Sequence, residues 1–178
     1  MKKLLCLLSV LSLSFAAFAQ ENVIPQRLEL VEIEEDEGDV SLEVFQFIKD
    51  GQSSYFLSVG NLGIGNEIVQ INVDPVFELF IPLGETLSEA MEVLQQMQEL
   101  FKTGAGSSLE VTGCLAPAVP TDEREPVKVT SRRLLLSRVL EFSVDRGDYI
   151  RATHVPRSSF NSLVTSLKLY RKIHPAEE

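Results

Sequence analysis

The sequence predicts an α+β fold, a mainly antiparallel sheet with two amphipathic helices packed on one of its faces. Two observations lead to this prediction. Short stretches of alternating apolar and polar residues, separated by turn residues, recur along the chain and are typical of antiparallel strands. Two longer stretches repeat apolar residues every three or four positions, which is the spacing of an amphipathic helix. Packing the helical stripes on the apolar face of the sheet removes both from water.

The first nineteen residues are expected to be a secretory signal peptide that does not belong to the fold. Two lysines precede an apolar run, and an Ala-Phe-Ala pattern places the cleavage between Ala19 and Gln20. The run is shorter than the roughly 20 apolar residues that a spanning helix needs, which argues against an uncleaved anchor. Residues 20–178 are then expected to form a single exported domain, periplasmic or secreted, with no membrane span.

The first half of this domain is predicted to hold five strands. Asp50-Gly51 predicts a two-residue hairpin turn, because glycine adopts positive φ at no steric cost. An acidic run at 32–39 is interpreted as a solvated turn, since it lacks the ligand order of a calcium-binding EF-hand. The predicted strands are 27–34, 40–49, 53–59, 67–73 and 77–81.

The first helix follows these strands. Thr86 and Glu89 form a capping box, in which each side chain accepts a hydrogen bond from the other residue's backbone amide. Gly104 is expected to stop the helix. The predicted apolar stripe comprises Leu87, Ala90, Met91, Leu94, Met97 and Phe101.

The second half repeats this order of strands and a helix. A proline-rich loop at 115–126 shows no packing pattern, and the second helix is expected to follow Pro156, with Ser158 or Ser159 as its cap. The predicted strands are 107–114, 127–131, 134–144 and 149–153, and the helical stripe comprises Phe160, Leu163, Val164, Leu167 and Tyr170.

The two helical stripes coincide when the first is shifted by 73 residues. This offset suggests two pseudo-repeated halves, residues 27–104 and 107–174, that arose by duplication. The alternative is that any hairpin followed by a helix gives the same succession, because all helical stripes share one spacing.

Charge is distributed unevenly between the halves. Residues 20–126 carry 4 basic and 21 acidic side chains, whereas residues 127–178 carry 10 basic and 5 acidic ones. Either the halves compensate one another, or the second half presents a basic face to a protein or an anionic ligand. Nucleic acid is not expected as a partner of an exported, acidic chain. The candidate binding residues are Arg132, Arg133, Arg138, Arg151 and Arg157.

Arg138 is the most unusual of these arginines. In the predicted strand 134–144 it shares a face with leucine, phenylalanine and valine side chains. A guanidinium on an apolar face needs a partner, so we expect an acid from the first half or a bound anion. The alternative is a strand break near Ser137 that turns Arg138 outward.

Residue types that usually carry catalysis are scarce. The two histidines, His154 and His174, form no recognised metal-binding motif, and no nucleophile-elbow pattern is present. Cys114 is interpreted as a buried, inert thiol. We therefore predict no catalytic residue, metal or cofactor, and a non-enzymatic exported binding module as the function. The alternative is a hydrolase or transferase that acts through carboxylates without a recognisable motif.

Overall fold

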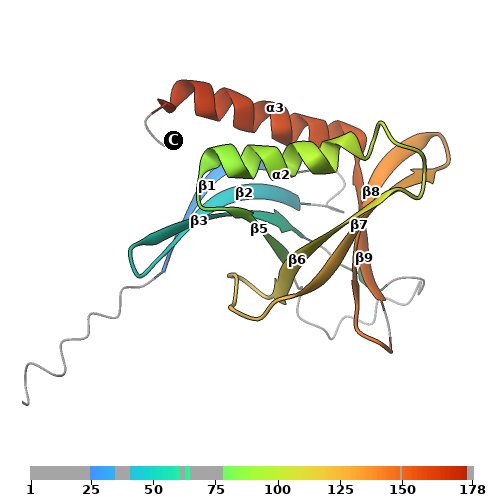
Figure 1. Ribbon diagram of the computed structural model, residues 1–178, viewed down its shortest axis with the longest axis horizontal. Coiled ribbons are helices and arrows are strands. Elements are labelled where there is room, and N and C mark those ends of the chain that lie inside the picture. The colour runs from blue at the N-terminus through green and yellow to red at the C-terminus, as the bar shows by residue number, and fades with distance from the viewer. Residues whose placement is uncertain (1–24, 35–40, 61–62, 65–77, 149, 176–178) are drawn as a thin grey trace, which may run out of the picture.

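The computed structural model describes residues 25–34, 41–60, 63–64, 78–148 and 150–175 (Figure 1). The predicted signal peptide, most of the acidic turn and the predicted strand at 67–73 lie outside these residues.

The strands form one curled antiparallel sheet in the order β1-β2-β3-β5-β6-β7-β8-β9-β4. β1 to β3, then β5, form one meander, and β6 to β9 form a second meander beside it. The short β4 pairs with β9 at the far edge. The bounds are β1 Gln26–Glu34, β2 Ser41–Lys49, β3 Gln52–Val59, β4 Gly63–Ile64, β5 Glu78–Gly84, β6 Ser108–Ala116, β7 Glu125–Leu134, β8 Ser137–Asp145 and β9 Ile150–Pro156.

Two helices, α2 (Leu87–Glu99) and α3 (Arg157–Ile173), pack against each other and against the same face of the sheet (Figure 1). Each follows the last strand of one meander, so both halves contain four meander strands and then a helix, except that the first half also contains β4 between β3 and β5. The predicted α+β class is confirmed. An origin by duplication remains a hypothesis, because four strands and a helix can recur without common ancestry.

The main core lies between the helices and the sheet. Leu94 of α2 and Leu167 of α3 are completely buried in it, together with side chains from both meanders. The predicted stripes therefore face inward, apart from Tyr170 at the margin, which is only partly buried. One continuous apolar cluster joins the two halves.

A second apolar cluster lies outside the main core, over β2, β3, β5 and β6. Its members are Phe45, Phe47, Phe56, Phe80, Cys114 and Ala116. The burial of Cys114 agrees with the sequence analysis. The loop between β6 and β7, in which the sequence shows no packing pattern, contacts the fold here: Thr121 donates its amide to Cys114 Sγ at 3.4 Å, and the Ala118 carbonyl accepts from Arg27 at 2.8 Å.

A predicted strand, a predicted helix cap and a predicted helix stop are also wrong. The strand predicted at 134–144 is a hairpin end plus β8, because Leu135 and Leu136 form a turn. Helix α3 begins directly after Pro156 without a side-chain cap hydrogen bond, so neither predicted serine caps it. Proline's fixed φ of about −65° suits this position. Helix α2 ends at Glu99, with Leu100 as C-cap, before the predicted stop at Gly104.

Candidate binding hairpin and neighbouring groove

The β7–β8 hairpin ends in an exposed apolar tip, which we call the leucine tip (residues 134–136). Leu134 pairs with Ser137, so only Leu135 and Leu136 form the turn. These two side chains are 95% and 92% exposed, and Leu134 is 44% exposed. The hairpin projects beyond the ends of both helices at the right of Figure 1. Its apolar side chains therefore face solvent at the far end of the molecule.

The backbone of this turn is unusual for its sequence. Leu135 has a φ of +52°, a region that glycine, asparagine and aspartate normally occupy in two-residue hairpins. A branched, bulky residue there costs on the order of 1 kcal/mol. The same chain uses Asp50-Gly51, with φ values of +52° and +75°, at the β2–β3 turn. Leucine at the β7–β8 turn is thus unfavourable both for backbone conformation and for exposure.

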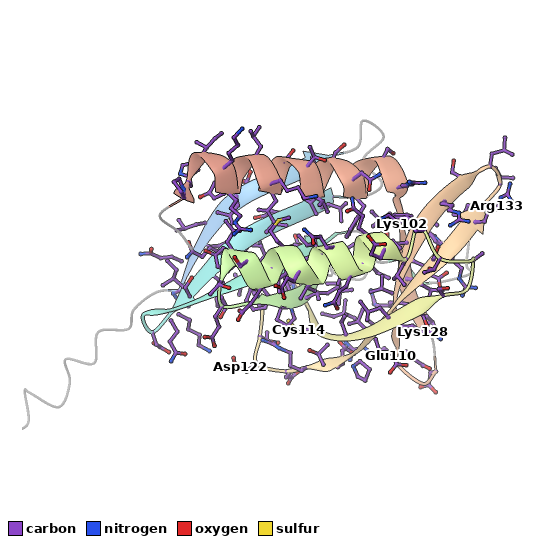
Figure 2. All side chains as sticks on the ribbon, turned by 45° about the horizontal axis from the view of Figure 1, so that its top comes forward. Lys102, Glu110, Cys114, Asp122, Lys128 and Arg133 are labelled. Atoms are coloured by element: carbon purple, nitrogen blue, oxygen red, sulfur yellow. The ribbon has the colours of Figure 1, made fainter. Side chains whose placement is uncertain are left out.

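Arginines lie on both sides of the hairpin beside this tip. Arg133 and Arg138 are cross-strand neighbours on the helix-facing side, whereas Arg132 lies opposite Val139 on the other side. Figure 2 shows Arg133 near the end of the hairpin. Residues 131–140 contain no acidic side chain. The hairpin end is therefore locally basic in a chain with a formal net charge of −10.

Contrary to our expectation, no carboxylate among the first-half residues that the structure describes pairs with Arg138. Its Nη1 donates to the carbonyl oxygen of Phe101, and to that of Thr103 at 2.8 Å, just beyond the end of α2. The strand does begin at Ser137, yet Arg138 stays on the same face as buried Leu140, so the outward-turned alternative is wrong as well. Backbone carbonyls at a helix end carry partial negative charge and attract cations. The side chain thus attaches the hairpin to the helix.

The remaining predicted arginines occupy two different settings. Arg157 places its guanidinium carbon 5.9 Å from the ring centre of Phe101, within cation–π range, so it lies near Arg138. Arg151 is buried in β9 and lies apart from the exposed hairpin end. The structure therefore gathers Arg132, Arg133 and Arg138 at the hairpin with Arg157 nearby, and separates Arg151 from them.

A polar groove lies across β6 to β9 on the face opposite the helices. Its volume is about 1010 Å³, and Glu110 and Lys128, labelled in Figure 2, lie along it. Glu141 anchors its centre: one carboxylate oxygen accepts from Arg132 at 3.2 and 3.0 Å, and the other lies 3.2 Å from His154 Nε2. The His154 ring thus lies against a carboxylate.

Thr130, which pairs with Glu141 across β7 and β8, also lines the groove. It is only 4% exposed, and its Oγ1 has no hydrogen-bond partner within the part of the chain that the structure describes.

The Glu141–His154 contact was not predicted from the sequence, because it depends on the register of two strands. The leucine tip did have a visible signal, three consecutive leucines between arginines.

Within the described ranges, no group of three or more His, Cys, Asp or Glu side chains is placed to hold a metal ion. Neither α2 nor α3 is long and apolar enough to cross a membrane. Comparison with protein-family models finds no match, and neither does comparison with curated protein sequences or with solved structures.

Proposed function

We propose that the protein is an exported, non-enzymatic binding module that contacts its partner through the leucine tip. The observation that carries the proposal is the pair Leu135 and Leu136, almost fully exposed at the end of a projecting hairpin. Burying a leucine side chain is worth about 1.5–3 kcal/mol, so leaving two in water forgoes a large stabilisation.

The local conflict between sequence and structure supports the same proposal. Leu135 occupies a positive-φ position that glycine would occupy without strain. Sequences agree with their local structure in most places and depart from that agreement mainly where function requires it. Leu135 and Leu136 are almost fully exposed, and Leu135 lowers stability. A partner that covers these side chains would explain why leucines are present at the tip.

Site-specific photo-crosslinking in cells tests the proposal directly. A photoreactive phenylalanine analogue at position 135 is expected to form adducts with a partner, protein or lipid. The same analogue at Glu123, an exposed residue of the loop covering the second apolar cluster, is expected to form none. Loss of the position-135 adduct on Leu136→Ser would assign the contact to the tip. Equal labelling from both positions, or labelling from neither, would contradict a tip-directed function.

Stability should change in the opposite direction from binding. Leu135→Gly relieves the positive φ and is expected to raise the free energy of unfolding by up to about 1 kcal/mol. Urea denaturation measures this change. The photoreactive analogue is then placed at position 136 of the Leu135→Gly variant. If this variant is more stable but no longer forms an adduct with the partner, Leu135 serves contact and not folding.

The groove supports a second candidate, the carboxylate-dependent hydrolase or transferase. The specific observation is Glu141 held between Arg132 and His154 in an open groove. A carboxylate that orients a histidine is an arrangement that general-base catalysis uses. Turnover of a panel of ester and phosphoester substrates that is lost in both Glu141→Gln and His154→Gln would favour this function. Turnover unaffected by either change would rule the groove out as its site.

A further inference from the structure

We propose that the partner of the leucine tip is the surface of an anionic lipid bilayer. In this arrangement Leu135 and Leu136 enter the acyl boundary, and the arginines beside them lie among the phosphate groups. The inference rests on the proposed function, since it identifies what the tip binds.

The shape of the tip favours a fluid phase over a protein surface. Stable protein interfaces bury roughly 800 Å² on each partner, which the end of a two-residue turn cannot supply by itself. A bilayer accepts a small convex apolar group without a matching pocket. Leu135 and Leu136 form such a group, because they are the most exposed apolar side chains in the described residues.

The arginines lie at a suitable depth for this contact. Strand residues rise about 3.3 Å each, so Arg133 and Arg138 are separated from the turn residues by roughly 3–7 Å along the hairpin. Apolar groups of interfacial proteins enter the boundary between headgroups and acyl chains by about 5–10 Å. The Arg133 guanidinium would then meet phosphates while the leucines are inserted, whereas Arg138 stays on the carbonyls beyond α2 and adds its charge from there.

Charge also selects which part of the molecule approaches the membrane. The chain as a whole carries a formal charge of −10, which an anionic surface repels, whereas the only charged side chains in residues 131–140 are three arginines. Arg132 is partly neutralised by Glu141, so Arg133 and Arg138 carry most of the local attraction. The molecule is therefore expected to approach with the hairpin first.

The hairpin is also held in place before binding. Arg138 donates to two backbone carbonyls beyond α2, which fixes the base of the hairpin against the helix layer. A prearranged contact loses little conformational freedom on binding. A short apolar tip with few cations gives weak, reversible attachment, since stable anchoring takes stronger signals.

Vesicle flotation of the purified chain tests the inference. Vesicles of phosphatidylcholine alone are compared with vesicles containing about one third phosphatidylglycerol, at low salt and in 0.5 M NaCl. We expect binding to the anionic vesicles at low salt, and several-fold weaker binding at high salt because charges are screened. Leu135→Ser with Leu136→Ser is expected to reduce partitioning at least tenfold, and Arg133→Gln several-fold.

Leu169→Ser is the matched control, because Leu169 is an exposed leucine on α3, far from the tip in the fold. It is expected to bind vesicles as the unchanged chain does. All variants share the same N-terminal segment, so any binding through that segment is common to them. An environment-sensitive fluorophore on Leu135→Cys should shift to the blue only with anionic vesicles, and circular dichroism checks that each variant is folded.

Three results would overturn the inference. The first is that the unchanged chain does not bind anionic vesicles. The second is that the Leu135→Ser, Leu136→Ser variant binds them as strongly as the unchanged chain does. The third is that the chain self-associates through the tip without vesicles, which would identify a second copy as the partner. If crosslinking from position 135 captures a protein while vesicles fail to bind, the proposed function stands and this inference falls. If both experiments fail, the binding role of the tip falls as well.

Discussion

At the scale of single residues, Arg138 shows how a charged side chain can lie at the margin of an apolar core without a carboxylate. A backbone carbonyl oxygen carries partial negative charge and accepts a strong hydrogen bond from a charged donor. Carbonyl oxygens of Phe101 and Thr103, just beyond α2, accept hydrogen bonds from the Arg138 guanidinium. The residue therefore joins the hairpin to the turn that follows α2, and through it to the helix layer.

Arg138→Met should reveal the value of this contact, since methionine keeps an apolar stem but donates no hydrogen bond. We expect the free energy of unfolding to fall by about 2 kcal/mol, the usual loss for hydrogen bonds from a charged group. Urea denaturation of Arg133→Met provides the control, because Arg133 is its exposed cross-strand neighbour. An Arg138→Met midpoint equal to that of the control would mean that the carbonyl contact adds nothing to stability.

Gly84 is required by the capping box at the start of α2. Thr86 and Glu89 each accept from the other's backbone, as predicted, and Glu89 also accepts from the Glu85 amide at 2.7 Å. Gly84 has a φ of +126°, and a Cβ there would lie 2.6 Å from Glu89 Cβ and from its Oε2. Only glycine leaves room for the carboxylate to reach the amides.

Gly84→Ala is therefore expected to lower the free energy of unfolding by about 2–3 kcal/mol, the sum of backbone strain and a damaged cap. Thermal or urea denaturation measures it. Gly104→Ala is the matched control, since a Cβ at Gly104 meets nothing within 4 Å. Similar losses from both substitutions would show that the effect comes from glycine replacement in general and not from the capping box.

Sequence reasoning succeeds at this scale where the partners are close in the chain. The capping box was predictable because Thr86 and Glu89 are three residues apart and on one helical turn. The partners of Arg138 were not, because Phe101 lies 37 positions away and meets it only through the packing of a strand on a helix. Of the candidate site, the sequence offered the arginines as candidates but neither their contacts nor the separation of Arg151 from the hairpin.

At the scale of elements, most strands and both helices were predictable because their periodicity is local. The hairpin at Leu135 and Leu136 was missed because the turn contains none of the residues that usually announce one. Its leucines resemble the apolar residues of the flanking strands, so the pattern of apolar residues predicts a continuous strand at 134–144 and no turn. The turn that the sequence did not predict is the proposed binding tip. Its leucines are unfavourable in a turn but favourable in contact with an apolar partner.

Strand β6 bends the sheet between the two meanders. Its first part, up to Gly113, pairs with β7, and its last three residues, beginning at Cys114, pair with β5. A Cβ at Gly113 would lie 2.8 Å from Val127 Cγ2 and 3.0 Å from the Phe80 carbonyl oxygen. Glycine permits this close approach of neighbouring strands, a requirement that no local pattern in the sequence reveals.

Gly113→Ala is accordingly expected to cost about 2–3 kcal/mol, because one contact is with backbone that cannot move without disturbing β5. The comparison is Thr112→Ala, at the exposed neighbouring position, which should change stability by less than about 1 kcal/mol. Denaturation with both circular dichroism and fluorescence of an external dye would measure the loss. Equal stability of Gly113→Ala and the unchanged chain would mean that β6 does not need glycine to turn between its two partners.

At the scale of the whole molecule, packing holds the two halves together more than charge does. Arg146 of the basic segment 127–178 pairs with Glu125 of the acidic segment 20–126 at 2.8 Å, but both residues belong to the second meander. Lys49 of β2 and Asp122, in the loop between β6 and β7, pair across the two meanders at 3.1 Å, and both side chains are exposed. The Arg27–Glu43 and Arg132–Glu141 pairs lie within one half. Exposed ion pairs contribute about 0–1 kcal/mol, far less than a shared apolar core.

Helix α3 provides this shared core, because it contacts strands at both ends of the curled sheet. It packs on β1 and β2 of the first meander and on β8 and β9 of the second, as well as on α2. Leu167, completely buried, belongs to the apolar cluster that spans both halves. Loosening this helix should therefore loosen both ends of the sheet together.

Leu167→Ala is expected to lower the free energy of unfolding by about 3–4 kcal/mol, because the core cannot close fully around the missing side chain. Hydrogen exchange in the variant should speed up in β1–β2 and in β8–β9 by the same factor, as in one cooperative unit. Leu169→Ala, at an exposed position of the same helix, should leave both unchanged. Faster exchange confined to β8–β9 would show instead that α3 stabilises only its own meander and that the halves unfold separately.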